Sequence, residues 1–291
     1  METTQQFFTP RTDNVYFITG VSSGLGRALA EVILAQGGRV AGTVRRPEHV
    51  ADLEALAPDG RALGVVLDVT DTAAVNAGVA QAIAHFGRID VLISNAGYGL
   101  VGAVEETSDA EALKLFDVNV LGAHRVIRAA LPHMRAQGSG HIMLAAAIGG
   151  FTGFGGLSVY TASKAAVDVL GEALAQEVKP FGIDVTVLTL GVFKTDFAGR
   201  SLNRVAEQVE AYEATPVGRF RAMMDNLDGN QPNDPYRAAE AIMHIAEAEE
   251  PPLRLALGND ALGVIAKKID AVQADVEAWR ELSASVAYAA A

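Results

Sequence analysis

Short apolar runs alternate with longer amphipathic stretches along most of this chain of 291 residues. The runs have the length of β-strands, and most are nearly continuous in apolar residues, which is typical of strands covered on both faces. The stretches between them show the spacing of amphipathic helices. The alternation predicts βαβ units, and therefore an α/β fold with a three-layer, doubly wound parallel sheet.

The runs and stretches can be placed along the chain by their residue numbers. Seven runs are predicted to be strands, at residues 15–19, 39–44, 62–67, 90–94, 141–146, 183–188 and 253–257. Five stretches are predicted to be helices, at residues 24–36, 72–85, 109–136, 160–179 and 235–248. Since no internal repeat, low-complexity tract or linker divides the chain, we predict a single domain over residues 1–291, with its core at about 12–260.

The regular alternation breaks at residues 200–232, where a polar helical segment and a loop are expected. Insertions of this length late in an α/β domain are often lids, so we expect residues 190–232 to form a substrate loop. A plain surface excursion is the alternative. The amphipathic tail at residues 261–286 would either cap the domain or join an interface, and we favour the cap.

Composition argues against several classes of function. The net charge of −12 would repel the phosphates of nucleic acids and anionic membranes, so neither is expected as a partner. The chain has no cysteine, which removes disulfides and thiol nucleophiles and fits a cytoplasmic location. Its six histidines show no ligand spacing, so no metal site is predicted.

Two segments bear on export and membrane insertion. Residues 1–14 lack the basic and apolar parts of a signal peptide, and are expected to be a loose lead-in. Residues 142–159 carry no charge and reach the length of a membrane span. Five glycines between residues 149 and 156 favour instead a buried strand that is followed by a glycine-rich loop.

Glycines mark the turn after the first predicted strand. Gly20, Gly24 and Gly26 stand in the stretch TGVSSGLGRALAE, which leads from that strand into a helix. Glycines at such a turn let backbone N–H groups approach a pyrophosphate at the positive end of the helix. Tight turns also use glycine for their geometry alone. The position between strand and helix favours a dinucleotide site.

The end of the second predicted strand indicates which dinucleotide would bind. An acidic residue there would accept the ribose hydroxyls of NAD, but the strand ends in Arg45 and Arg46 with no acid. A guanidinium can bind a 2′-phosphate through two hydrogen bonds, so Arg45 points to NADP(H). The alternative is a pair of solvated arginines in a loop.

Small polar residues follow the third and fourth predicted strands. Asp68 and Val69 come after the third strand, and Asn95, Ala96 and Gly97 come after the fourth. Ligands of open α/β sheets bind at this carboxyl edge. Each motif also has a structural explanation: Asp68 could cap the next helix, and the other three residues could form an ordinary turn.

Tyr160 and Lys164 stand four residues apart in a predicted helix, so they share one helical face. A nearby ammonium stabilises phenolate and lowers a tyrosine pKa that is ordinarily near 10. Such a tyrosine can donate a proton to a carbonyl or accept one from an alcohol. An exposed pair without chemistry is the alternative.

Together, in this order and spacing, the motifs resemble the short-chain dehydrogenase/reductase family over residues 12–260. The matching residues are Thr19 to Gly26 as T-G-x-x-x-G-x-G, Asp68-Val69, Asn95-Ala96-Gly97, Asn119 within FDVNV, and Tyr160-x-x-x-Lys164. The resemblance implies a Rossmann-like sheet of about seven parallel strands with the nicotinamide at its carboxyl edge. It also suggests a homodimer or homotetramer, formed through the long helices at 109–136 and 160–179.

The resemblance implies a role for each matching residue. Tyr160 would be the general acid or base, Lys164 would bind the nicotinamide ribose and lower the tyrosine pKa, and Asn119 would hold a water in the proton relay. The residues implied to bind NADP(H) are Gly20, Ser23, Gly24, Leu25 and Gly26 at the pyrophosphate, Arg45, Asp68 and Val69 around the adenosine, Asn95, Ala96 and Gly97 near the ribose, Tyr160 and Lys164, and Val192 and Thr195 at the nicotinamide.

Two residues depart from the family pattern. Ala147 stands where the family usually has a serine that hydrogen-bonds the substrate oxygen, and a methyl group cannot donate. Losing one such donor costs about 10²- to 10³-fold in rate in better-studied sites. Leu190 stands where proline is common ahead of Gly191, which would alter the backbone beside the nicotinamide.

Three functions are therefore open. The first is an NADP(H)-dependent oxidoreductase that interconverts a carbonyl and an alcohol on a small, apolar substrate through Tyr160, with Thr152 or Ser158 as substitute donors. The second is a non-redox isomerase, cyclase or dehydratase that keeps NADP(H), suggested by Ala147 and the apolar residues Phe151, Phe154 and Leu157. The third is a cofactor-sensing binding protein. Ala147 could also be an introduced substitution that leaves a weakened enzyme.

Overall fold

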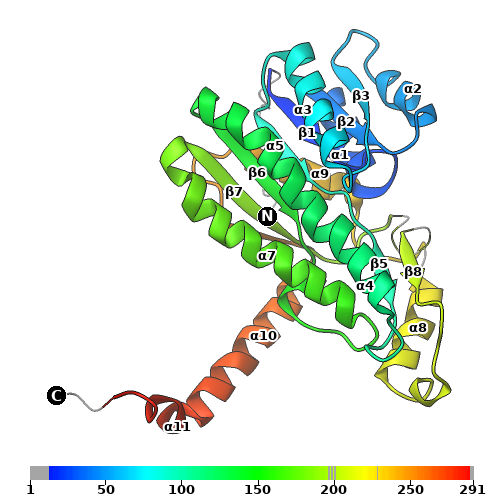
Figure 1. Ribbon diagram of the computed structural model, residues 1–291, viewed down its shortest axis with the longest axis vertical. Coiled ribbons are helices and arrows are strands. Elements are labelled where there is room, and N and C mark those ends of the chain that lie inside the picture. Colours follow the sequence, from blue (N-terminus) through cyan, green and yellow to red (C-terminus); the bar gives the residue numbers. More distant parts are fainter. Residues whose placement is uncertain (1–12, 196, 198, 200, 228, 289–291) are drawn as a thin grey trace, which may run out of the picture.

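A sheet of parallel strands forms the centre of the computed structural model, which describes residues 13–195, 197, 199, 201–227 and 229–288. Its seven strands confirm all seven predicted ones: β1 (Val15–Ile18), β2 (Arg39–Val44), β3 (Ala62–Val66), β4 (Val91–Ser94), β6 (Gly140–Ala145), β7 (Ile183–Leu190) and β9 (Arg254–Leu257). Their order is β3-β2-β1-β4-β6-β7-β9, and every pairing is parallel (Figure 1). The predicted doubly wound α/β fold is confirmed.

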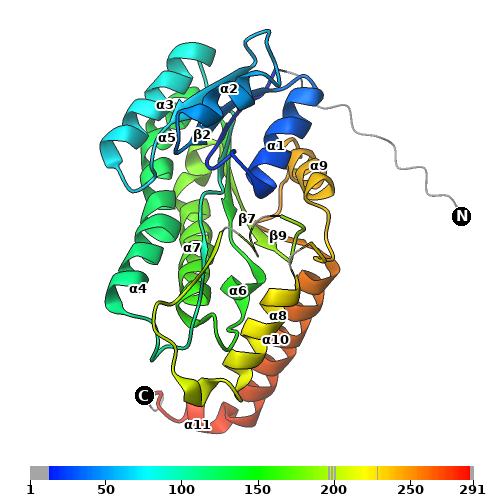
Figure 2. The same ribbon diagram turned by 90° about the vertical axis from the view of Figure 1, so that its right-hand side faces the viewer.

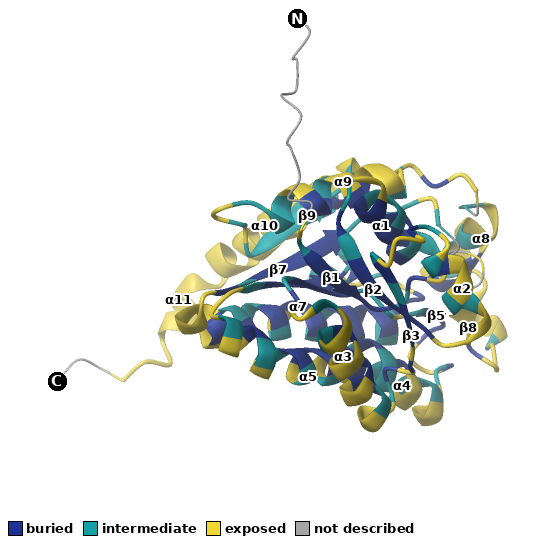
Figure 3. Cartoon of the chain, turned by 90° about the horizontal axis from the view of Figure 1, so that it is seen from above, coloured by how far each residue is buried: buried dark blue, intermediate teal, exposed yellow. Residues whose placement is uncertain are grey.

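Helices cover both faces of this sheet (Figure 3). One face packs against α3 (Thr72–Phe86), α5 (Gly122–Gln137) and α7 (Ser158–Val178), and the other against α1 (Gly24–Ala35), α2 (Glu48–Glu54) and α9 (Pro235–Ala246). Strand β1 shows why both layers form, because Tyr16 and Ile18 are buried on one side while Phe17 is buried on the other. The apolar side chains of each strand thus alternate between two cores.

The predicted helix at residues 109–136 is interrupted. It consists of α4 (Asp109–Phe116), a π-helical turn (Asp117–Leu121) and α5. Helix α4 begins with a capping box in which Ser108 and Glu111 bond each other's backbone amides, as the spacing of serine and glutamate favours. Buried apolar residues occur both before and after this π-turn, in α4 and in α5. The spacing of apolar residues in the sequence therefore does not reveal the turn. Asn119 lies in this turn.

The segment around residues 190–232 carries more structure than expected. Its chain forms β8 (Leu202–Arg204), a 3₁₀ turn (Glu210–Tyr212) and α8 (Pro216–Leu227). Strand β8 pairs in parallel with β5 (Gly99–Val101), and neither short strand was predicted. Residues 196, 198, 200 and 228 of the predicted loop lie outside the described residues. The predicted glycine-rich loop after β6 contains a short helix, α6 (Ile148–Phe151).

The C-terminal tail is helical but does not cap the domain. Helix α10 (Asn259–Ala278) and α11 (Arg280–Ala284) project from the body (Figure 1). Every residue from 266 to 288 is exposed to solvent (Figure 3). Only Ala261 of α10 is buried. The expectation of a cap is therefore wrong, because the helix extends beyond the body and most of its apolar residues are exposed. The expected N-terminal lead-in, up to residue 12, lies outside the described residues.

Within the described residues, none of the helices combines the length and the apolar character needed to cross a lipid bilayer.

Candidate active site

The strand order reverses between β1 and β4, and a hydrogen-bonded turn joins the carboxyl ends of these two strands. The Thr19 hydroxyl accepts hydrogen bonds from the backbone amides of Asn95 and Ala96, both at 2.9 Å. In return, the side-chain amide of Asn95 donates to the carbonyl oxygens of Thr19 at 2.9 Å and Gly20 at 3.2 Å. Asn95, Ala96 and Gly97 are thus held at the switch point, where doubly wound sheets bind ligands.

The glycine-rich turn after β1 fits a pyrophosphate. Gly20 and Gly24 have φ angles of +76° and +60°, which side chains rarely tolerate. A side chain at Gly26 would overlap the Gly20 carbonyl, so the helix can approach the turn only with glycine there. Ser23, in extended conformation, makes no side-chain cap, and the first turn of α1 is left for a ligand. The Leu25 side chain is buried in the core, so only its backbone could contact that ligand.

Arg45 and Asp68 lie exposed at the ends of β2 and β3. Burial alone would raise the pKa of Asp68, but hydrogen bonds from Thr70 and the charges of Arg45 and Arg125 outweigh it and lower the pKa. Helix α3 is capped by Asp71, so the alternative in which Asp68 serves as the cap is wrong. Val69 is buried beneath this edge.

Tyr160 and Lys164 are both buried in the first half of α7, so the alternative of an exposed pair is wrong. The Lys164 ammonium donates a hydrogen bond of 2.7 Å to the carbonyl oxygen of Ala145, at the end of β6. It lies 6.0 Å from the centroid of the Tyr160 ring. Strand β6 therefore fixes the lysine, and the helix places the phenol beside it.

Asn119 lies next to this pair in the π-turn and is also buried. Its side-chain amide donates to the Tyr98 carbonyl at 3.0 Å and to the Ser163 hydroxyl at 3.1 Å, and its oxygen accepts from the Tyr98 amide. A Cβ at Gly97 would lie 3.0 Å from that oxygen and 3.6 Å from the Lys164 ammonium nitrogen. Gly97, Asn119 and Lys164 therefore converge on one point of the sheet edge.

Sequence reasoning missed Ser163. Its hydroxyl donates to the Tyr160 carbonyl oxygen at 2.7 Å and accepts from Asn119, which links α7 to the π-turn. Ser163 is fully buried. The sequence did contain a signal, because Ser163 directly precedes Lys164 on a helix that must cover the sheet. A serine buried in such a place is nearly always hydrogen-bonded to another polar group.

Burial acts on the two titratable groups in opposite directions. It raises the pKa of Tyr160 above its ordinary value, because a phenolate is costly away from water. It lowers the pKa of Lys164 to about 8. The expected lowering of the tyrosine pKa by Lys164 is not found, because desolvation dominates both groups.

Ala147 begins α6 in extended conformation and supplies no side-chain cap. The Tyr160 hydroxyl makes no hydrogen bond with another described residue. The two candidate substitutes do not bond it either: Thr152 ends α6, and Ser158 begins α7. The position expected to hold a serine thus carries a methyl group, which cannot donate a hydrogen bond.

Apolar side chains surround the tyrosine. Tyr160 belongs to a buried cluster with Leu100, Val101, Leu115, Leu157 and Val205, against which Tyr98, Phe154, Val159, Leu202 and Phe220 pack. The Phe197 ring lies 5.8 Å from the Tyr160 ring, centroid to centroid. We call β5 and residues 201–227 the lid, because they supply much of this cluster.

A buried ion pair anchors the lid. Glu106 binds the Arg221 guanidinium of α8, and its oxygens accept from the amides of Ala103 at 2.7 Å and Val209 at 2.8 Å. Arg221 also reaches Glu213 at 3.0 Å. Burial alone would raise the pKa of Glu106, but these hydrogen bonds and the Arg221 charge outweigh it and lower the pKa.

The loop after β7 is braced by Asp260, which sequence reasoning did not identify. Its carboxylate accepts from the Val192 amide at 2.7 Å and from the Asn233 side chain at 2.8 Å. Thr195 in this loop lies against Gly24, where an added Cβ would be 3.6 Å from the Thr195 Cβ. The expected nicotinamide loop therefore faces the glycine-rich turn.

Leu190, the second departure from the family pattern, pairs with Leu257 as the last residue of β7.

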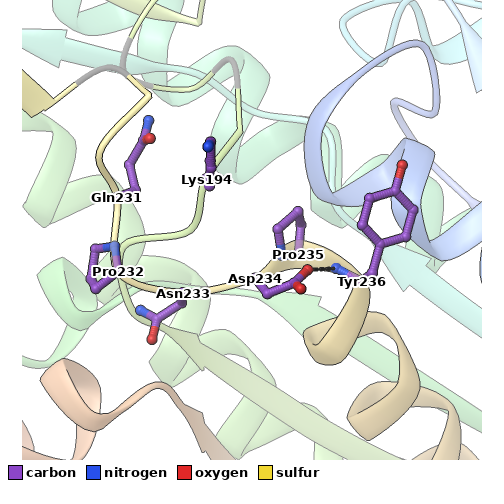
Figure 4. Close-up of a pocket in the computed structure, with 7 residues that line it drawn as sticks. All are labelled: Lys194, Gln231, Pro232, Asn233, Asp234, Pro235 and Tyr236. Atoms are coloured by element: carbon purple, nitrogen blue, oxygen red, sulfur yellow. Dashed lines mark hydrogen bonds between the residues drawn. The ribbon is translucent and has the colours of Figure 1, made fainter.

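A pocket of about 400 Å³ lies behind this loop (Figure 4). Lys194, Gln231, Asn233 and Tyr236 are among its lining residues, and Gln231 donates to the Thr195 carbonyl oxygen at 3.2 Å. Neither Tyr160 nor Lys164 lines it. In the described part of the chain, no group of three or more His, Cys, Asp or Glu side chains is placed to hold a metal ion.

Comparison with known proteins adds relatives of the whole chain. The family model described as short chain dehydrogenase matches residues 14–205. Oxidoreductase BOA17 of Botryotinia fuckeliana is 40% identical over 92% of this chain and 97% of its own length. 3-Ketodihydrosphingosine reductase of Bacteroides thetaiotaomicron is 34% identical over 84% and 87%. Human 17-beta-hydroxysteroid dehydrogenase type 1 is 32% identical over 88% and 81%.

Solved structures agree with these relatives. A short-chain dehydrogenase from Streptomyces avermitilis has a TM-score of 0.87 and 42% identity, covering 94% of this chain and 98% of its own. A short chain dehydrogenase/reductase from Burkholderia phymatum, in complex with NAD, has a TM-score of 0.78 and 25% identity, covering 90% of this chain and 95% of its own. The structure of ElxO with NADP bound has a TM-score of 0.70 and 25% identity, covering 86% of this chain and 99% of its own. The chain therefore belongs to the short-chain dehydrogenase/reductase family.

Proposed function

We propose that the chain is an NADP(H)-dependent oxidoreductase that interconverts a carbonyl and an alcohol on an apolar substrate. The observation that carries the proposal is the buried cluster of Tyr160, Lys164 and Asn119 at the carboxyl edge of the sheet. A phenol beside an ammonium can exchange a proton with a substrate oxygen. The apolar residues of the lid face that phenol.

The dinucleotide would be held by residues from separate strand ends. The glycine-rich turn would bind its pyrophosphate, Asp68 and Val69 its adenine, and Val192 and Thr195 its nicotinamide. When bound, the nicotinamide supplies or accepts the hydride. Relatives bind NAD or NADP, and the exposed Arg45 favours NADP(H) here, because a guanidinium binds a 2′-phosphate where a carboxylate would repel it.

The residues of the chain would manage the proton. Because burial raises its pKa, Tyr160 is protonated at neutral pH and would be able to donate a proton to a carbonyl oxygen. Lys164 and Asn119 would position the ribose and the proton relay, while Ser163 holds Asn119 in place. The lid would exclude water from the substrate oxygen.

The apolar wall around Tyr160 supports an apolar substrate class. Phe197 lies against the phenol ring, and Tyr98 and Phe154 pack against the buried cluster to which Tyr160 belongs. Two relatives bear names that denote a hydroxysteroid and a 3-ketosphingoid substrate. We therefore place apolar ketones first among the candidates.

The test is to follow nicotinamide absorbance while the protein is offered a panel of apolar ketones with NADPH or NADH. We expect turnover with NADPH to exceed turnover with NADH, and Tyr160→Phe to abolish it. Arg45→Glu should reverse the preference between the two cofactors. Binding of NADPH without oxidation by any ketone, or unchanged turnover in Tyr160→Phe, would contradict the proposal.

A second function is favoured by one feature, the alanine at position 147 in a chain whose Tyr160 lies in an apolar cluster. A non-redox isomerase, cyclase or dehydratase on this scaffold would not need a donor at the substrate oxygen. Ala147→Ser separates the two. An oxidoreductase that lacks its donor should gain about a hundredfold in rate, whereas a non-redox enzyme should gain nothing and leave the cofactor unchanged.

A further inference from the structure

Helix α10 carries an exposed apolar stripe along its length. The stripe repeats with alternating spacings of three and four residues, as Leu262, Ile265, Ile269, Val272, Val276 and Trp279. All of these except the half-buried Ile265 are between 46% and 63% exposed. This heptad spacing keeps one seam facing a second helix in a coiled coil.

The helix has little else to support it. It is 20 residues long, and only its first turns lie against the body. An isolated helix of this length is marginally stable in water, because most helical stability in proteins comes from packing an apolar face. The stripe therefore needs a cover, and no described part of the chain supplies one.

We propose that the α10 stripe pairs with the α10 stripe of a second copy of this chain, in antiparallel orientation. Setting Ile269 opposite Val272 of the second copy also aligns Leu262 with Trp279 and Ile265 with Val276. Each stripe is then covered along its whole length by the stripe of the other copy. A two-fold axis between the helices makes this contact self-complementary.

Charge supports the antiparallel orientation. Lys268 and Asp275 occupy equivalent flanking positions of the heptad, on the same side of the stripe, and neither side chain forms an ion pair with another described residue. In the antiparallel pair, Lys268 of each copy lies beside Asp275 of the other, so the two-fold axis makes this ion pair twice. A parallel pair would place Lys268 beside Gln273 instead.

The attachment of the helix also favours this orientation. The first turn of α10 is fixed to the body by buried Ala261 and by Asp260, which holds the loop after β7. An antiparallel pair therefore sets the two domains at opposite ends of the helices. A parallel pair would bring both domains to the same end.

A lipid surface fits the stripe less well. Membrane-binding helices carry mostly lysine and arginine on their polar face. The polar face of α10 mixes both signs, with Lys267 and Lys268 against Asp270, Asp275 and Glu277. The net charge of −12 opposes binding to anionic lipid as well.

The chain provides its own probe, since Trp279 is its single tryptophan. In sedimentation of the full chain over a range of concentrations, we expect dimers, with tryptophan emission that shifts to shorter wavelength as they form. Ile269→Glu should weaken dimerisation at least tenfold and remove the shift. The matched control, Ala274→Glu on the opposite face of the same helix, should leave both unchanged.

Exchange of the flanking charges tests the orientation. Lys268→Asp and Asp275→Lys should each weaken the dimer several-fold, and the double variant should restore it. In a parallel pair the double variant would not recover, because the introduced lysine would meet Arg280. A chain that stays monomeric, a dimer unaffected by Ile269→Glu, or binding of α10 to phosphatidylserine vesicles without self-association would overturn the proposal.

Discussion

The cofactor edge, formed by the ends of β1 to β4, and the lid are built in different ways. At the cofactor edge, the contacts join the ends of neighbouring strands, as when Thr19 binds the amides of Asn95 and Ala96. In the lid, a buried ion pair joins Glu106 and Arg221, which are 115 residues apart. Strand-end contacts follow from the fold itself, whereas the ion pair depends on two particular side chains meeting.

The comparison implies that the lid can be loosened without loss of the cofactor site. Arg221→Met would leave the Glu106 carboxylate buried without its counter-charge, so we expect a loss of about 3–5 kcal/mol in lid stability. Thermal unfolding and protease sensitivity of residues 201–227 should report it. KM for the ketone should rise while the affinity for NADPH stays the same.

The double variant Glu106→Gln with Arg221→Met removes both charges and should recover part of that stability. Acid should act like the single variant: since the folded pKa of Glu106 is lowered, its stabilisation is present above the ordinary glutamate pKa and is lost as pH falls through the folded value. Equal loss of cofactor affinity and lid stability would remove the distinction between the two regions.

A substitution in the glycine-rich turn should instead affect the cofactor edge and leave the lid intact. Gly26→Ala would push a methyl group into the Gly20 carbonyl, so we expect NADPH affinity to fall by about a hundredfold, or about 2.7 kcal/mol. Titration calorimetry measures it. Gly263→Ala in α10, where an added Cβ meets no atom within 4 Å, is the control and should bind NADPH normally. Normal binding by Gly26→Ala would show that this turn does not hold the pyrophosphate.

The buried Lys164 gives the cofactor edge a pH signature. The pKa of Lys164 is about 8 in the folded chain and 10.5 ordinarily, so between these values the unfolded chain holds more protons. The free energy of unfolding of cofactor-free protein should therefore rise by about 1.5 kcal/mol from pH 8 to 9.5. Denaturant titrations of wild type and Lys164→Met measure the difference. An identical pH dependence in the two proteins would show that Lys164 is not desolvated.

The smallest effect is expected at Asp260, which braces the loop after β7 outside both regions. Asp260→Asn removes the charge that accepts from the Val192 amide but keeps the shape of the side chain, so we expect a loss of about 1 kcal/mol. That corresponds to a KM for NADPH raised about fivefold, with thermal stability nearly unchanged. A fall in kcat without any change in KM would mean that Asp260 acts on the substrate side instead.

The cofactor edge could largely be read from the sequence, because its determinants are local. Continuous apolar runs specify strands covered on both faces, and turn chemistry at their ends places Gly20, Asp68 and Asn95 at one edge. The helices on either face of the sheet follow from the handedness of βαβ units, once β1 pairs with both β2 and β4. The register of Tyr160 and Lys164 follows from helical periodicity alone.

The remaining features depended on tertiary contacts. Nothing local to Glu106 marks it as the partner of Arg221, and nothing local to Asp260 marks it as the brace of Val192. The π-turn around Asn119 leaves the apolar spacing intact, and the direction of α10 depends on where its first turn is fixed. The sequence by itself therefore determined the layered sheet and its ligand edge, since periodicity and turn residues act over a few positions. Only the tertiary structure decided the lid, the braces and the free helix, because their energies come from side chains that meet across the fold.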